Sequence, residues 1–267
     1  MTWTRRALAK LSLIIAAVFI AGNTVPPAVA NDLQNILDKG VVRIGVPLDV
    51  APFGFVDSGG KPIGLDVDMA EMVAKELGVE LELQQITGIN RIPFLVTNKL
   101  DIVISVMGAT PERAKQIAFT SPYAGLYIGV FGSSANQVED PKDFGDLKIG
   151  VPRGTTQDIS ITELHPDGNI VRFEDDATSA AAYLAGQVDV FATANIVARE
   201  LAKQHPDKDF TPLYKIRNSP AHMGVRIGEL ELLRWLDTFI FYNKMNGNLD
   251  ALHEKWMGEP MAKLPSM

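Results

Sequence analysis

Residues 41–47 read VVRIGVP, and residues 147–154 read LKIGVPRG. Both stretches are short runs of β-branched residues that end in Gly-Val-Pro, which is typical of a buried strand followed by a turn. A second pair of similar runs follows, NKLDIVIS at 98–105 and GQVDVFAT at 186–193. Because the order of the elements also repeats, we interpret the chain as two related halves rather than as a chance likeness between short Val/Ile strands.

Helical patterns lie between the strands, so each half is expected to consist of βα units around a parallel-rich sheet. Residues 66–77 illustrate the pattern, because Val67, Ala70 and Ala74 fall on one helical face and Gly78 is placed to end the helix. The sequence therefore predicts an α/β fold with two lobes.

Two apolar runs, YIGVFGSS at 127–134 and HMGVRIG at 222–228, are suited to carry the chain from one lobe to the other. We expect the first lobe at residues 31–131, the second lobe at 132–223, and a return to the first lobe at 224–267. The returning segment has helical patterns and no strand of its own, so we expect it to pack against the first lobe.

The first 30 residues differ in composition from the rest. Arg5, Arg6 and Lys10 precede the apolar run LSLIIAAVFIAG, and the segment ends with Ala-Val-Ala at Ala30. This is the pattern of a secretory signal peptide cleaved after Ala30. A membrane anchor is the alternative, but the apolar run is shorter than the roughly 20 residues that a span requires. The mature protein is therefore expected in the periplasm.

Charge and the absence of cysteine limit the classes of function. The formal charge of −7 becomes −10 without the leader, which contains three basic residues and no acidic one. An acidic protein is a poor partner for nucleic acids and anionic membranes. With no cysteine, the chain has no disulfide, thiol nucleophile or thiolate metal site. The four histidines are scattered without the spacing of metal ligands, so we expect no metal and no cofactor.

The stretch GATPERAKQIAFTSPY at 108–123 begins where an apolar strand ends. Thr110 is placed as an N-cap and Pro111 as the first helical residue, so Arg113 falls in the first turn of a helix. The free N–H groups of the helix start and the guanidinium of Arg113 together form the donor set of a carboxylate clamp. A surface arginine paired with a nearby acid is the alternative.

The matching stretch of the second half is VPRGTTQD at 151–158. Here a strand ends, a glycine turns the chain, and Thr155, Thr156 and Gln157 open the next helix. Hydroxyl and free N–H groups at this point favour an anionic ligand group. Simple N-capping by either threonine is the alternative.

The stretch APFGF places Phe53 and Phe55 after the first strand, where they form either an apolar wall of a ligand site or part of the core. Ligands bind beyond the carboxyl ends of parallel strands, so the residues at these ends are expected to converge on one cleft. The candidate ligand-binding residues are Asp49, Phe53, Phe55, Asn90, Arg91, Ser105, Met107, Gly108, Arg113, Thr155, Thr156, Gln157, Thr193 and Asn195.

Three stretches in this order resemble the family-3 extracellular solute-binding proteins, the periplasmic receptors of polar amino-acid ABC importers: RIGVPLDVAPFGFVDSGGKPIGLDVDMAEMVAKELG, RIPFLVTNKLDIVISVMGATPERAKQIAFTSPY and KIGVPRGTTQD. The resemblance covers nearly all of residues 31–260. It implies a type II periplasmic-binding-protein fold, in which two α/β lobes joined by two crossing strands close around a small ligand. We expect a monomer that binds a small carboxylate, delivers it to an ABC transporter permease, and binds no nucleic acid.

The resemblance also implies roles for single residues. Arg113 of TPER matches the arginine that holds the ligand's α-carboxylate in the family. Thr156 matches a threonine that assists, and Ser105 matches a serine at a strand end. The aromatic residue that the family has near the first strand falls at Val50 or Phe53.

One position departs from the family pattern. The family commonly places an aspartate for the ligand's α-ammonium at the end of a late strand of the second lobe, where this sequence has Ala194. A buried ammonium without an anion is costly. Either another acid such as Asp49 replaces the aspartate, or the ligand lacks a primary α-amine. Arg91 is expected near the rim of the same cleft. It either holds a second carboxylate of the ligand or forms a salt bridge at the rim.

Two other functions remain as alternatives. A cyclohexadienyl dehydratase-like enzyme on the same scaffold needs a catalytic glutamate past this late strand, but the matching position is Val197, with Glu200 one turn later. The general acid of that chemistry is therefore missing. A ligand-sensing module is less expected, because no transmembrane helix or output domain precedes Met267. We predict a receptor and not an enzyme.

Overall fold

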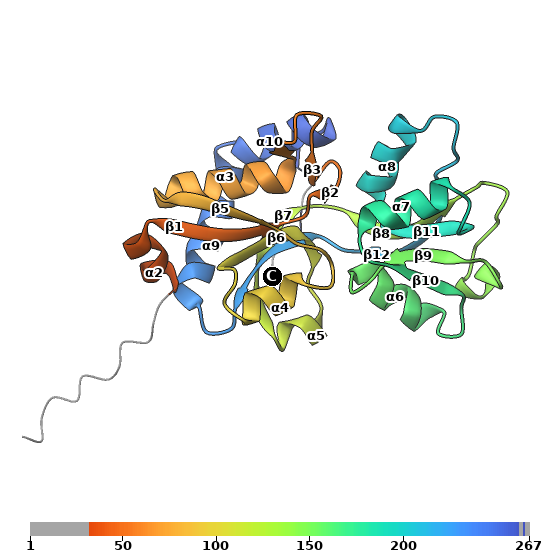
Figure 1. The fold of residues 1–267 in the computed structure, drawn as a ribbon, viewed down its shortest axis with the longest axis horizontal. Helices are drawn as coiled ribbons and strands as arrows, with labels where there is room; N and C mark the ends of the chain where they lie inside the picture. Colours follow the sequence, from red (N-terminus) through yellow and green to blue (C-terminus); the bar gives the residue numbers. More distant parts are fainter. Residues whose placement is uncertain (1–31, 262–263, 265–267) are drawn as a thin grey trace, which may run out of the picture. The chain divides into compact units, whose positions relative to one another are not determined.

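The computed structural model describes residues 32–261 and residue 264 of the 267-residue chain. The predicted signal peptide, with its cleavage after Ala30, lies outside the described residues. Within the described part, the strands form two five-stranded sheets and a small three-stranded sheet (Figure 1). None of the described helices has both the length and the apolar character needed to span a bilayer.

The first large sheet has the strand order β5-β1-β6-β13-β7. Its strands are β1 (Val41–Val46), β5 (Glu80–Gln85), β6 (Ile102–Gly108), β7 (Ile117–Ala124) and β13 (Ala221–Arg226). Strand β1 is parallel to β5 and β6, whereas β13 is antiparallel to β6 and β7. The helices of this part are α2 (Asp32–Lys39), α3 (Leu65–Leu77), α4 (Arg91–Val96), α5 (Pro111–Ala114), α9 (Leu230–Met245) and α10 (Asn248–Met257).

The small sheet follows β1 and consists of β2 (Asp49–Val50), β3 (Gly54–Val56) and β4 (Pro62–Ile63). We call the first large sheet, the small sheet and these helices lobe 1.

The second large sheet, with its helices, forms lobe 2 and has the order β10-β9-β11-β8-β12. Its strands are β8 (Tyr127–Gly132), β9 (Ile149–Pro152), β10 (Ile170–Phe173), β11 (Val190–Ala194) and β12 (Thr211–Asn218). Strand β9 is parallel to β10 and β11, and β8 is antiparallel to β11 and β12. Its helices are the 3-10 helix η1 (Pro141–Phe144), α6 (Thr156–Leu164), α7 (Asp176–Leu184) and α8 (Asn195–Gln204).

The strands predicted from the repeated stretches hold equivalent places in the two sheets. Strand β1 lies beside β6 in lobe 1, and β9 lies beside β11 in lobe 2. The predicted helix is α3, and Gly78 caps its C-terminus with a φ of 72°, a conformation that suits glycine. The two-lobed α/β arrangement expected from the sequence is therefore present.

The chain passes between the lobes at residues 125–126, between β7 and β8, and at residues 219–220, between β12 and β13. The two connections lie side by side, because the Ser219 N–H donates to the Leu126 carbonyl at 3.0 Å. These crossings come a few residues before the boundaries suggested by the sequence, since an apolar strand pattern does not reveal which sheet the strand joins.

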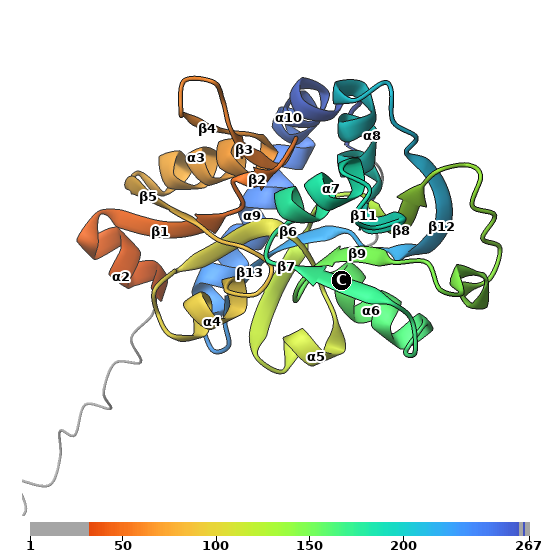
Figure 2. The same cartoon turned by 45° about the vertical axis from the view of Figure 1, so that its right-hand side comes forward.

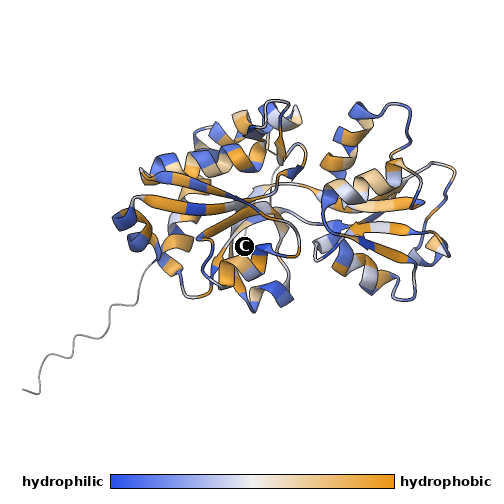
Figure 3. Ribbon diagram, viewed as in Figure 1, coloured by the Kyte–Doolittle hydropathy of each residue, from blue (hydrophilic) through white to orange (hydrophobic). Residues whose placement is uncertain are grey.

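The returning helices α9 and α10 pack on the strands and helices of lobe 1. Leu232, Leu236 and Leu249 are buried in the same apolar cluster as the β1 residues Val42 and Ile44. Figure 3 shows apolar residues concentrated along the strands, while the helices alternate between apolar and polar positions. Helix α10 also contacts α3 of the same lobe (Figure 2).

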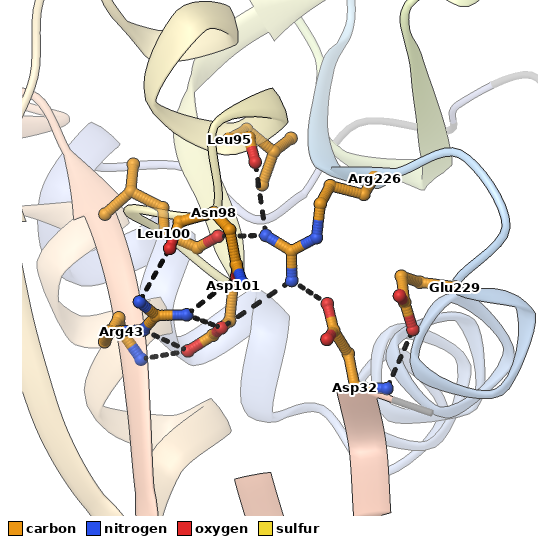
Figure 4. Close-up of polar contacts among 8 residues, drawn as sticks. All are labelled: Asp32, Arg43, Leu95, Asn98, Leu100, Asp101, Arg226 and Glu229. Atoms are coloured by element: carbon orange, nitrogen blue, oxygen red, sulfur yellow. Dashed lines mark hydrogen bonds and ion pairs between the residues drawn. The ribbon is translucent and has the colours of Figure 1, made fainter. Parts of the chain in front are cut away.

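A polar network joins α2, β1, β13 and the segment before β6 in lobe 1 (Figure 4). Arg226 on β13 forms ion pairs with Asp32 of α2 and with Asp101, which directly precedes β6. Arg43 on β1 binds the same Asp101 carboxylate through Nε at 3.1 Å and Nη2 at 2.5 Å. The network therefore ties the returning strand to the N-terminal elements of the lobe.

Candidate functional site

A cavity lies where elements of the two lobes meet. Lobe 1 contributes residues that follow β1, the start of α4 and the end of β6, and lobe 2 contributes the starts of α6 and α7 and the end of β11. Leu126 and Ser219 of the two connections also line it. The enclosed space has a volume of about 40 Å³, which holds a few water molecules at most.

Half of the candidate residues from the sequence line this cavity. They come from both lobes and are Asp49, Arg91, Ser105, Thr155, Thr156, Gln157 and Thr193. The carboxyl ends of strands from two sheets thus converge on one space, as the topology of parallel strands leads us to expect.

Four of the remaining candidates have other surroundings. Phe53 is fully buried in the core of lobe 1, and Phe55 packs edge-on against Trp256 with ring centroids 5.9 Å apart. Met107 is buried in a second apolar cluster of lobe 1. The Asn90 side chain accepts the Thr87 N–H at 2.9 Å and so shapes the loop before α4.

Asn195, Gly108 and Arg113 also lie outside the cavity lining. The Asn195 side chain accepts the Tyr127 N–H at 3.0 Å, next to one connection between the lobes. A Cβ atom added to Gly108 would lie 2.4 Å from Ser219 Oγ and 2.9 Å from Thr156 Oγ1. Glycine at 108 therefore lets these two hydroxyls approach the end of β6.

Arg113 sits directly behind the cavity wall. Its helix α5 starts as predicted, with Pro111 as its first residue and Thr110 Oγ1 accepting the Arg113 N–H at 3.2 Å. Its side chain is buried. The guanidinium donates through Nη1 to Gly108 O and Thr156 Oγ1, both at 2.8 Å, and through Nη2 to Gly154 O at 3.0 Å. Arg113 thus links lobe 1 to the first turn of α6 in lobe 2.

Arg91 is the cation that lines the cavity itself. It is the first residue of α4 and only 5% exposed. Its Nη1 donates to Ser105 O at 3.1 Å, while its buried Nε has no hydrogen-bond partner. Burial lowers the pKa of Arg91 to about 10, against the raising effect of the Asp176 charge. A buried donor without a partner is costly, which favours a ligand acceptor at this place.

The two arginines form a buried positive region. Burial, and then the nearby charge of Arg91, lower the pKa of Arg113 to about 9, so both groups stay charged at neutral pH. Among the described residues, neither arginine forms an ion pair with a carboxylate. Two planar guanidinium groups without a counter-ion are suited to hold a carboxylate ligand.

The start of α6 faces this region from lobe 2. Thr155 is the N-cap, with its Oγ1 accepting the Asp158 N–H at 3.3 Å and donating to Pro152 O at 2.7 Å. Thr155 therefore acts as an N-cap of α6 in this structure, which is the alternative to ligand binding considered from the sequence. Thr156 uses its hydroxyl to accept from Arg113, and Gln157 lines the cavity beside it.

Asp176 is a cavity residue that the sequence reasoning missed. It is the first residue of α7, and its N–H donates to Asp49 Oδ2 at 2.9 Å. Burial and the neighbouring charge of Asp49 raise the pKa of Asp176 to about 7, against the lowering effect of Arg91. The signal was present, because FEDD at 173–176 follows the carboxyl end of the parallel strand β10.

Other cavity residues had no clear signal in the sequence. Thr87 and Gly88, in the loop between β5 and α4, and Val106, in β6, line the cavity. Val106 has a φ of 44°, which is unusual for a β-branched residue. Its N–H donates to Asp66 Oδ2 at 3.1 Å, so a buried carboxylate holds this backbone turn.

The walls next to Asp176 are apolar. Ala194 and Val197 line the cavity at the end of β11 and in α8, so no carboxylate extends from the position where the family pattern has an aspartate. Within the described residues, no group of three or more His, Asp or Glu side chains is arranged to hold a metal ion.

Comparison with known proteins places these features in a family. An L-cystine-binding protein of Escherichia coli (strain K12) is 25% identical over 253 residues, which are 94% of this chain and 95% of that protein. A glutamine-binding protein of Geobacillus stearothermophilus is 34% identical over 194 residues, which are 70% of this chain and 73% of that protein.

Solved structures confirm the fold predicted from the sequence. The ancestral amino acid-binding protein AncCDT-1, a precursor of cyclohexadienyl dehydratase, has a TM-score of 0.77 at 33% identity and covers 85% of this chain and 100% of its own. The sequence profile of the bacterial extracellular solute-binding proteins, family 3, matches residues 42–259. The chain therefore belongs to family 3 of the bacterial extracellular solute-binding proteins.

Proposed function

We propose that the protein is the periplasmic receptor of an ABC importer and binds a small carboxylate-bearing solute, an amino acid or a similar molecule, in the cavity between its lobes. The observation that carries this proposal is the buried pair Arg91 and Arg113, which has no carboxylate partner among the described residues. A carboxylate beside these guanidinium groups would supply the missing counter-ion.

The binding residues belong to both lobes, so ligand binding favours closure of one lobe on the other. Arg113 supports this role, because its guanidinium already contacts Thr156 and Gly154 of lobe 2. In the proposed complex, Arg113 and Arg91 hold the carboxylate, and Ser105, Thr156 and Gln157 add polar contacts. The closed receptor, acting as a monomer, then delivers the ligand to a permease. Export with cleavage after Ala30 would bring it to the periplasm.

A panel of ligands tests the proposal by thermal shift. The exported protein is unfolded and refolded once to remove carried ligand, then mixed with α-amino acids and with matched carboxylates that lack the amine. A ligand at about 100 times its dissociation constant adds about 2.7 kcal/mol of stability, which is a shift of about 2–4 °C for a chain of this size. Stabilisation by uncharged analogues alone would contradict the proposal.

We also propose that the protein does not transform its ligand. Val197 stands where a cyclohexadienyl dehydratase-like enzyme needs its glutamate. Glu200 is absent from the cavity lining and lines an adjoining groove that shares Asp49, Asp176 and Val197 with the cavity. Incubation with prephenate, followed by an assay for phenylpyruvate, tests this point. Turnover above the uncatalysed rate would favour the enzyme alternative.

A further inference from the structure

Two acidic residues line the same cavity as Arg91. Asp49 comes from β2 of lobe 1 and Asp176 from the first turn of α7 in lobe 2, and both line the cavity. The Asp176 carboxylate has no hydrogen bond or ion pair with the other described residues. Asp49 uses Oδ2 to accept the Asp176 N–H, while its buried Oδ1 has no partner. Two neighbouring carboxylates of the cavity lining thus retain oxygens without a partner.

Burial disfavours the charged forms of both carboxylates. It raises the pKa of Asp49, although the N–H groups of α7 lower it, and it raises the pKa of Asp176, where the repulsion by the charge of Asp49 acts in the same direction. Arg91 is near enough to affect the Asp176 pKa, but the two groups form no ion pair. A cationic group placed between the carboxylates would remove this repulsion and satisfy their free oxygens.

The ligand complementary to this cavity has an anionic and a cationic group close together. We propose that Asp176, with Asp49 beside it, accepts the ammonium group of a zwitterionic α-amino acid whose carboxylate lies at Arg91 and Arg113. This inference rests on the proposed function and names the ligand class and a residue that determines specificity. The ammonium-binding carboxylate is then supplied by the start of α7 and not by the end of β11, where Ala194 is found.

This arrangement also couples recognition to closure. The ammonium group bridges Asp49 of lobe 1 and Asp176 of lobe 2, and the carboxylate bridges the arginines of lobe 1 and the α6 start of lobe 2. A carboxylic acid without the amine would leave the Asp176 carboxylate and Asp49 Oδ1 without a partner, which costs free energy at a buried site. The cavity should therefore bind an amino acid more tightly than its amine-free counterpart.

Isothermal titration calorimetry on the refolded exported protein tests the inference. The probes are L-glutamine, L-arginine and L-cysteine, and the corresponding acids that lack the α-amine. Asp176→Asn removes the charge with little change in size and keeps the main-chain bond to Asp49. Glu174→Gln is the matched control, because Glu174 is an exposed acid close to Asp176 in sequence and outside the cavity lining.

The expected result is a loss of amino-acid affinity of about 10- to 100-fold in Asp176→Asn, the usual effect of one charged hydrogen bond. Affinity for the amine-free acid stays the same or rises, and Glu174→Gln behaves like the wild type. Equal losses for both ligand types, or unchanged amino-acid affinity, would overturn the inference. Tighter wild-type binding of amine-free acids would overturn it while the receptor function stands. A wild type that binds no carboxylate would overturn both.

Discussion

At the scale of single residues, Asp66 is a buried carboxylate next to the cavity wall. It is fully buried, and it accepts hydrogen bonds from Tyr123 Oη at 2.8 Å and from the Val106 N–H at 3.1 Å. Burial raises the pKa of Asp66 to about 7, although these two hydrogen bonds lower it. The group therefore retains a proton in the folded protein at pH values where it is ionised in the unfolded chain.

This difference in proton binding predicts a stability that depends on pH. Between about pH 4 and about pH 7 the folded state binds the extra proton, so the free energy of unfolding falls as pH rises, by about 1.4 kcal/mol per pH unit from this group. Asp66→Asn should make the fall shallower. Urea denaturation across this range measures it, with the exposed Asp207→Asn as control. If the free energy of unfolding of Asp66→Asn falls with pH as steeply as that of the wild type, Asp66 does not carry the extra proton of the folded state.

At the scale of secondary-structure elements, Arg226 joins segments that are distant in sequence. Besides its ion pairs with Asp32 and Asp101, it donates to the carbonyl groups of Leu95 and Leu100, at the end of α4 and just before β6. Replacement by glutamine leaves these acceptors and charges without their partner. We expect Arg226→Gln to lower the free energy of unfolding by about 3–5 kcal/mol.

Because the Arg226 network lies outside the cavity, ligand affinity should survive the change. Denaturation in urea gives the stability, and calorimetry below the unfolding transition gives the affinity. The exposed Arg234→Gln on α9 is the matched control. A large loss of affinity without a loss of stability would show that the network serves the site and not the fold.

Two loops at the cavity approach each other closely at Gly88. A Cβ atom at this position would lie 2.7 Å from the main-chain oxygen of Arg153 and 2.8 Å from Thr155 Cγ2 in lobe 2. Because one obstacle is backbone, rotation of a side chain cannot relieve the clash. Gly88→Ala should therefore weaken ligand binding by about tenfold or more, a cost of at least about 1.4 kcal/mol for closure.

The thermal stability of ligand-free Gly88→Ala should stay close to that of the wild type, since the open form avoids the clash. Calorimetry and thermal unfolding of the same samples separate the two effects. Gly59→Ala, in an exposed loop where the new Cβ meets only Asp57 Oδ1 at 3.3 Å, is the control. Wild-type affinity in Gly88→Ala would contradict a closed complex with this loop contact.

At the scale of the whole molecule, the sequence predicts the architecture better than the site. The two Gly-Val-Pro stretches and the apolar runs are typical of strands buried in a sheet, so they predict β1, β6, β9 and β11 and their order. The cap at Thr110 is also local, and it correctly predicts the start of α5. Which sheet receives β8 and β13 depends on long-range pairing, which an apolar pattern alone does not encode.

The cavity lining depends on side-chain direction, so the sequence reveals only part of it. Phe53 follows the first strand as a wall residue would, yet it points into the core. Asp176 is the last of three consecutive acidic residues, and acidic residues are common at the start of any helix. The sequence alone therefore does not mark Asp176 as a site residue. Only the fold shows that the carboxyl end of β10 brings Asp176 to the Asp49 side of the cavity.

The most direct test of the central claim is calorimetric titration of the stabilising carboxylate into the wild type, Arg91→Gln and Arg113→Lys. Arg153→Lys, an exposed arginine just before the start of α6, serves as the control. The account predicts one site per chain, control affinity equal to wild type, and a loss of about tenfold or more in Arg91→Gln and in Arg113→Lys, because each loses a fork of donors to the carboxylate. Wild-type affinity in both of these variants would contradict a carboxylate site between the lobes.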